Sequence, residues 1–275
     1  YQEMGYILAA TVEYLKALEE RGVSAAEAIP HFRFCLSIGP NYFIEIAKFR
    51  AMRILLNRVL DAFDVPEAGR HLHLHARTGL WNKTLFDPYV NMLRTTTEAF
   101  SAVIGGCDSL HVGAFDEIIR EPDDFSRRIA RNTHHILAEE CDLTQVLDPA
   151  GGSWAVESLT DKMAKQAWGA FQGIEEAGGM LAALESGLPQ SEVEAVRQEK
   201  ARNIQRRKDV IVGTNNYPNA TEKLPGSRNV DYDAIRRERK EAVLAHRKSR
   251  GGEADSALAK LGKVSGRAEA ERVEA

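Results

Sequence analysis

Three histidines recur at every second position of the chain: His71, His73 and His75. Because side chains two apart on a β-strand point to the same face, a pair of this spacing can chelate zinc. Imidazoles about 7 Å apart along one face cannot all converge on one ion, and no carboxylate stands between or directly beside them. The spacing therefore favours histidines that line a polar interior, and we predict no metal site. A metal-dependent barrel hydrolase stays open as an alternative hypothesis.

Two further patterns could carry chemistry. The glycine-rich run from Asp148 to Trp154 (DPAGGSW) could hold a phosphate with its backbone amides. It lacks the lysine followed by a hydroxyl residue of a nucleotide-binding P-loop, so a tight turn is the favoured interpretation. His134 and His135 lie on a predicted helix, where such a pair indicates partial burial or a surface position rather than catalysis.

The elements that must position these residues alternate between short strands and long helices up to about residue 140. Period-two alternation and short β-like runs predict strands over residues 31–38, 72–78 and 109–115. Helices are predicted over residues 3–20, after the cap Asn41, after Asp87-Pro88, and from Asp123 or Asp124 to Glu140. The fold class is therefore α/β. Three strand-helix units predict about half of an eight-fold TIM-type β/α barrel, with two open edges.

Beyond residue 140 the pattern becomes a helical extension. We expect a helix from about Thr160 that stops at Gly178-Gly179, a helix begun by a Ser191 and Glu194 capping box, and a short strand over residues 210–213. The domains are then predicted as 1–140, half of a β/α barrel; 141–225, the helical extension; and 226–275, a charged and partly disordered tail. Disorder is expected over residues 248–275.

Composition excludes several classes of protein. The 275 residues are 44% hydrophobic, which is enough for a real core, and carry a net charge of −4. This charge gives no basic field for nucleic acid or a membrane surface, and no apolar run reaches the ~20 residues of a membrane span. The three cysteines lie outside any CxxC pair, which is typical of a reducing compartment, so a cytoplasmic location is expected. The chain begins at Tyr1 inside a helical pattern, and we expect a natural split subunit or a fragment.

Several segments, in the same order and spacing, resemble the methylmalonyl-CoA mutase family. The resemblance extends over about residues 3–225 and is carried by residues 86–96 (FDPYVNMLRTT), 109–111, 115–117, 128–133, 148–154 and 211–215. It implies that the chain is the second half of a β/α barrel that binds an acyl-CoA through its axis and stacks on a separate cobalamin-binding domain. Adenosylcobalamin would then supply the radical for the carbon-skeleton rearrangement, as between methylmalonyl-CoA and succinyl-CoA.

The resemblance also implies site residues. His75 and Glu117 match positions that face the cofactor, and Glu117 would hold the adenosyl ribose. Arg77 stands where catalytic members have Gln, and Gly113 stands where they have Asn near the adenosyl group. His31 and Arg33 replace the Arg and Ser of an Arg-x-Ser motif that binds the CoA portion. We expect Arg77 to pair with Glu117.

These substitutions resemble the small subunits of heterodimeric mutases, which keep the barrel without the active site. The family's substrate-contacting Tyr-His pair would lie just before Tyr1, and the Asp-x-His-x-x-Gly motif of the cobalamin domain is not in the chain. The resemblance thus implies a catalytically silent chain, with adenosylcobalamin held by a separate domain or by a partner, either a large mutase subunit or a cobalamin-binding chain. A catalytic barrel fragment acting on another acyl-CoA is the first alternative.

Overall fold

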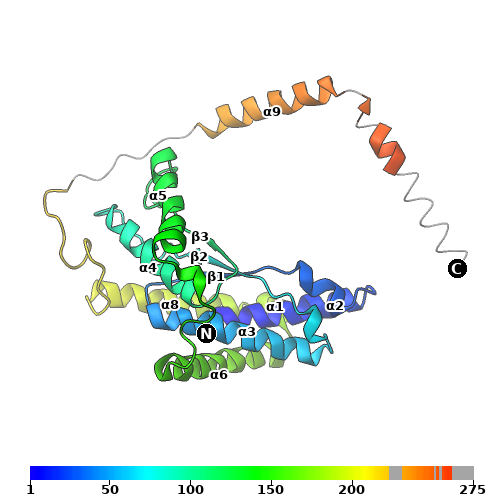
Figure 1. Ribbon diagram of the computed structural model, residues 1–275, viewed down its shortest axis with the longest axis horizontal. Coiled ribbons are helices and arrows are strands. Elements are labelled where there is room, and N and C mark those ends of the chain that lie inside the picture. Colours follow the sequence, from blue (N-terminus) through cyan, green and yellow to red (C-terminus); the bar gives the residue numbers. More distant parts are fainter. Residues whose placement is uncertain (223–230, 251, 254–255, 262–275) are drawn as a thin grey trace, which may run out of the picture. The chain divides into compact units, whose positions relative to one another are not determined.

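The computed structural model describes residues 1–222, 231–250, 252–253 and 256–261 (Figure 1). The chain divides into two compact units, Tyr1–Ser227 and Arg228–Ala275. All three strands of the described residues belong to the first unit. Every site residue predicted from the sequence also lies within its bounds.

A parallel sheet of three strands forms the centre of the first unit. The strands are β1 (Phe34–Ile38), β2 (Leu74–Thr78) and β3 (Ser109–His111), in the order β1-β2-β3. Helix α3 (Tyr42–Ala62) connects β1 to β2, and α4 (Val90–Ile104) connects β2 to β3. Crossovers of this length are what parallel neighbours require. The predicted parallel β/α arrangement is confirmed, while closure into a barrel stays a prediction.

The predicted strand boundaries need four corrections, the first being that β2 begins at Leu74 rather than residue 72. Strand β1 begins at Phe34 rather than residue 31, because Ile29–His31 form a 3-10 helix. The third strand ends at His111, since the Gly113 amide beyond it donates to the side-chain oxygen of Thr78 at 2.8 Å. The strand predicted over residues 210–213 is wrong, because Val212 makes only an isolated bridge.

The hydrophobic core joins three long helices to the sheet. Helix α6 (Trp154–Glu176) packs against α1 (Gln2–Glu19) and against α3. At the α1–α6 contact, a Cβ added to Gly5 would lie 2.8 Å from the Cβ of Ala170, so the two backbones approach closely. Fully or nearly fully buried side chains of this core are Met4, Leu8, Leu15, Leu36, Ile38, Phe49, Met52, Leu56, Leu74, Ala167 and Ile174. The predicted domain boundary near residue 140 stays a prediction, although α6 shares the core of the preceding helices.

The remaining elements of the first unit are short or peripheral. They are α2 (Ala25–Ala28), α5 (Asp124–His135) with a π-helical end (Ile136–Glu140), α7 (Met180–Ser186), α8 (Leu188–Gln205), and 3-10 turns at Glu67–Gly69 and Leu143–Gln145. The predicted start of α5 is confirmed, because Asp123 and Ser126 form a reciprocal capping box. Ser191, in contrast, lies inside α8, which begins after Gly187 with Pro189 in its first turn. Likewise, α6 begins at Trp154 rather than near Thr160.

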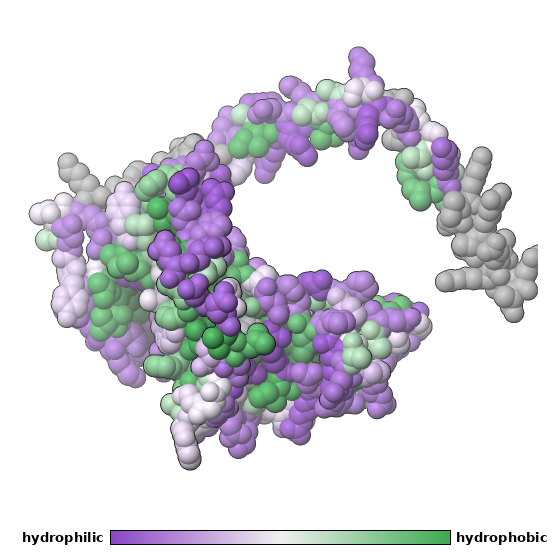
Figure 2. Space-filling model, viewed as in Figure 1, coloured by the Kyte–Doolittle hydropathy of each residue, from purple (hydrophilic) through white to green (hydrophobic). Residues whose placement is uncertain are grey.

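The second unit contains helix α9 (Tyr232–Ser249), whose start is capped by the Asp231 carboxylate. Figure 2 shows mostly hydrophilic side chains along it, interrupted by apolar ones. Ile235 and Leu244 are among the exposed apolar side chains of α9. Disorder was predicted from residue 248. Residues 248–249 instead end α9 and residues 256–261 are helical, while 251, 254–255 and 262–275 lie outside the described residues. Among the described helices, none is long and apolar enough to cross a lipid bilayer.

Candidate functional site

One face of the sheet is polar and open to solvent, while the other is buried. Leu36, Leu74 and Ala76, on the buried face, are completely inaccessible. Strand register aligns two rows of residues on the open face, because paired residues of parallel strands project to the same side. The rows are Cys35, His75 and Ser109, followed by Ser37, Arg77 and His111. His75 and Arg77 therefore share one face, as the sequence predicted.

A shared hydroxyl in the first row links His75 to His73. Ser109 Oγ lies 2.8 Å from His73 Nε2 and 2.8 Å from His75 Nδ1, so the two rings are bridged by one hydroxyl. Burial lowers the pKa of the His75 imidazole below its usual value, and the nearby His111 lowers it further. A neutral His75 fits this bridge, since one ring can accept the hydroxyl proton while the other donates to the oxygen.

The three alternating histidines do not gather into a metal site. His71 precedes β2 and is exposed, while the rings of His73 and His75 are both engaged by Ser109. In the part of the chain that the structure describes, no cluster of three or more His, Cys, Asp or Glu side chains has the arrangement to hold an ion. The metal-dependent hydrolase hypothesis draws no support from these residues.

The second row places Arg77 beside Glu117. Arg77 Nη2 lies 3.8 Å from Glu117 Oε2, the ion pair expected from the sequence. The Glu117 side chain is only 15% exposed, whereas that of Arg77 is 51% exposed, so the guanidinium lies at the solvent edge of the sheet rather than in an enclosed cavity. Gly113 lies directly against the Glu117 carboxyl group, since a Cβ built on it would be 2.7 Å from Glu117 Cδ.

His31 and Arg33 lie at the opposite end of the sheet. Both precede β1, at the amino ends of the parallel strands, whereas Gly113 and Glu117 follow the carboxyl end of β3. Both residues are exposed, and Arg33 Nη1 donates to the backbone oxygens of Pro30 and Phe32 at 2.8 Å. The structure therefore brings Arg77, Gly113 and Glu117 together and leaves His31 and Arg33 apart from them.

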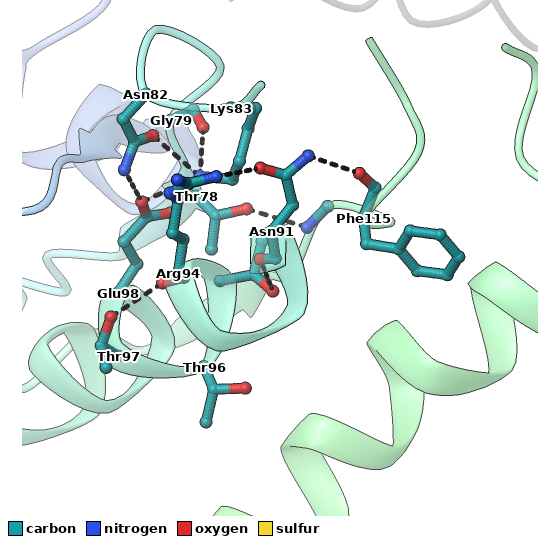
Figure 3. A network of polar contacts seen from close by, with 12 residues as sticks. Thr78, Gly79, Asn82, Lys83, Asn91, Arg94, Thr96, Thr97, Glu98 and Phe115 are labelled. Carbon is teal, nitrogen blue, oxygen red and sulfur yellow. Dashed lines mark hydrogen bonds and ion pairs between the residues drawn. The ribbon is translucent and has the colours of Figure 1, made fainter. Parts of the chain in front are cut away.

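A buried polar network supports the loops at the carboxyl ends of the strands (Figure 3). Lys83 Nζ lies 2.8 Å from both oxygens of Glu98 and 2.8 Å from the Gly79 carbonyl oxygen. The side chains of this Lys83–Glu98 pair are each 1% exposed. Burial lowers the pKa of Lys83 and raises that of Glu98, while their mutual attraction opposes both shifts.

The network extends to the segment that carries Glu117. The amide group of Asn91 donates to the backbone oxygen of Phe115 at 2.9 Å, two residues before Glu117. Thr78 holds the Gly113 amide from the other side. The sequence did not single out Lys83, Glu98 or Thr78, because their contacts depend on how the loop after β2 folds. Asn91 had a signal, since it stands within the matching run 86–96.

The turn at residues 148–154 is structural. Gly151 N donates to the Asp148 carbonyl oxygen at 2.9 Å, which closes a tight turn as predicted. Arg50 of α3 then clamps it, with ion pairs of 2.9 Å to Asp148 and 2.8 Å to Glu157. Because the Gly151 and Gly152 amides already donate to Asp148 and Glu157, they are not available to hold a phosphate.

Comparison with known proteins places these features in one family. A family model described as methylmalonyl-CoA mutase matches residues 1–275. The chain is 42% identical over 223 residues to the methylmalonyl-CoA mutase small subunit of Porphyromonas gingivalis, covering 80% of this chain and 36% of that protein. It is 45% identical over 222 residues to the small subunit of Streptomyces virginiae, covering 81% of this chain and 36% of that protein.

Large subunits are similar as well. The large subunit of the Porphyromonas gingivalis mutase is 38% identical over 242 residues, which is 88% of this chain and 34% of that protein. The chain thus spans about a third of the length of the curated relatives that it matches.

Proposed function

Because the chain belongs to the methylmalonyl-CoA mutase family, we propose that it forms part of an adenosylcobalamin-dependent mutase that rearranges the carbon skeleton of an acyl-CoA. Within this complex it is the small-subunit-like chain and is catalytically silent. Relatives named as small and large subunits support a large mutase subunit, or another cobalamin-binding chain, as its partner. The substrate class is an acyl-CoA of the methylmalonyl or succinyl type.

The ion pair of Arg77 with Glu117 is the observation that carries this proposal. When bound, adenosylcobalamin supplies the radical that starts the rearrangement, and its ribose needs hydrogen-bond acceptors. Glu117 is the residue matched to that task, but its carboxylate faces a guanidinium and lies against Gly113. This arrangement supports the proposal that these residues do not hold the adenosyl group and that catalysis resides in the partner chain.

Complementation tests the proposal. The chain is purified alone and together with a large-subunit-type partner, and the conversion of methylmalonyl-CoA to succinyl-CoA is measured with added adenosylcobalamin. We expect no turnover and no cobalamin absorbance change for the chain alone, and turnover for the assembled pair. Micromolar cobalamin binding by this chain alone, or turnover without a partner, would contradict the assignment.

We also propose that the complex is cytoplasmic. The support is that Cys35, Cys107 and Cys141 are all free, as is typical of a reducing compartment.

A further inference from the structure

The backbone conformation does not require a glycine at position 113. Glycine is needed where φ lies in the left-handed region, and Gly113 is not among the glycines with positive φ. It is nevertheless buried, and its Cα faces the carboxyl group of Glu117. A Cβ at this position would stand 2.7 Å from Glu117 Cδ and closer still to Oε1, both well inside van der Waals contact. The missing side chain therefore provides space for one particular carboxylate.

Hydrogen bonds from neighbouring side chains hold the backbone at Gly113 and at Phe115. The Gly113 amide is held by Thr78 Oγ1 at 2.8 Å, and the Phe115 backbone oxygen is held by Asn91 at 2.9 Å. Since the backbone is fixed before and after Gly113, a new side chain there could not be accommodated by a small shift of the loop. The Glu117 side chain would have to move instead.

The carboxylate is held in this position mainly by charge. Arg77 Nη2 lies 3.8 Å from Glu117 Oε2, and the Glu117 charge acts on Lys83, whose pKa it raises against the larger opposing effect of burial. Glu117 Oε1 is buried and accepts no hydrogen bond from the described residues. A buried oxygen without a donor destabilises this position of the Glu117 side chain. The net free energy that favours the position is therefore small.

A second place for the carboxylate lies next to the first. A cavity of about 380 Å³ opens between β3 and α5, and Glu117 is one of its lining residues. His111, Arg131 and His134 also line it and offer donors to a carboxylate, against the repulsion of Glu121, which lines it as well. A rotation of the Glu117 side chain away from Gly113 would bring Oε1 out of its buried position and toward this cavity.

We infer that Gly113 is the positioning residue for Glu117: because it leaves this space empty, the carboxylate lies beside Arg77 with Oε1 buried, out of reach of a hydroxyl-bearing ligand in the cavity. The inference deepens the proposed function, on which its significance rests, because it names the substitution that makes the acidic group unavailable. Any side chain at position 113 releases Glu117, even with Arg77 present.

Carboxyl labelling tests the position of Glu117 directly. The full chain, in the form in which it purifies, is treated with a water-soluble carbodiimide and glycinamide, and labelling of Glu117 is measured by mass spectrometry. We expect Gly113→Ala to raise the labelling of Glu117 several-fold, because the carboxylate moves from a niche where the side chain is 15% exposed. The matched control is Gly169→Ala, where the added methyl group meets nothing within 4 Å, and its Glu117 labelling should equal that of the unsubstituted chain. Unchanged labelling in Gly113→Ala would overturn the inference.

A second measurement separates positioning from a general loss of packing. We expect Gly113→Ala to change the midpoint of thermal unfolding less favourably in the unsubstituted chain, where Glu117 must move, than in a Glu117→Ala background, where nothing stands in the way. An equal change in both backgrounds would mean that the added methyl group does not meet Glu117, and would refute the inference. Neither readout involves turnover or a partner, so failure of the proposed function would leave this result interpretable.

Discussion

At the scale of single residues, the Lys83–Glu98 pair links the loop after β2 to helix α4. Both side chains are 1% exposed, so each charge depends on the other. We expect Lys83→Met to destabilise the chain by about 3–5 kcal/mol, because it leaves a buried carboxylate without its cation. The double variant Lys83→Met with Glu98→Leu should recover most of that loss.

Denaturant unfolding of the four combinations checks this coupling. The exposed pair Lys165–Asp161 provides the control, since Lys165→Met should cost less than about 1 kcal/mol. If Lys83→Met unfolds at the same denaturant concentration as the parent chain, the pair does not stabilise the loop.

Substitution of Arg77 tests whether this chain is catalytically silent or takes part in catalysis. In the assembled complex we expect Arg77→Gln to leave acyl-CoA turnover within about twofold, a change worth less than 0.5 kcal/mol in activation free energy. The reason is that Gly113, His31 and Arg33 still differ from the catalytic pattern, so the partner retains the chemistry. Turnover is compared after size-exclusion chromatography has shown intact assembly. A large rise or fall would favour the alternative, a catalytic barrel piece that acts on another acyl-CoA.

At the scale of elements, the contact between α1 and α6 depends on Gly5. In an open helix, Gly→Ala stabilises by up to about 1 kcal/mol. At Gly5 we expect Ala to destabilise instead, by roughly 1–3 kcal/mol, because its Cβ would lie 2.8 Å from that of Ala170. Gly173→Ala on α6 meets no neighbouring atom and should raise the unfolding midpoint. Calorimetry of both variants gives the comparison, and a stabilising Gly5→Ala would show that the two helices are free to separate.

At the scale of the whole molecule, the sheet is incomplete at its edges. Strands β1 and β3 each have one neighbour among the described strands, and the Ser37 amide on the β1 edge is taken up by the Glu3 carboxylate at 2.8 Å. The open face carries polar rows instead of a packed layer. We expect the isolated chain to aggregate or to bind a partner, as measured by light scattering after size exclusion. A monodisperse monomer that melts cooperatively would contradict the half-barrel prediction.

The sequence predicted the parallel β/α order and the start of α5 because both depend on local signals. Capping by Asp123 involves residues three apart, and strand alternation is visible within a few residues. Boundaries were less predictable where distant groups compete. His31 could have extended β1, but the turn after Ala28 with Pro30 favours a 3-10 helix. Val212 has the composition of a strand, yet Arg94 of α4 takes its carbonyl oxygen and no neighbouring strand is described.

By itself, the sequence determined the family, the order of the strands and the residues that share a strand face, because periodicity and motif spacing are properties of short segments. It also indicated that Arg77 and Glu117 would meet. Only the tertiary structure decided that Gly113 makes room for the Glu117 carboxylate, that Lys83 is buried against Glu98, and that His31 and Arg33 lie at the other end of the sheet. These features depend on the distance and direction between atoms far apart in the chain, which packing of the whole unit sets.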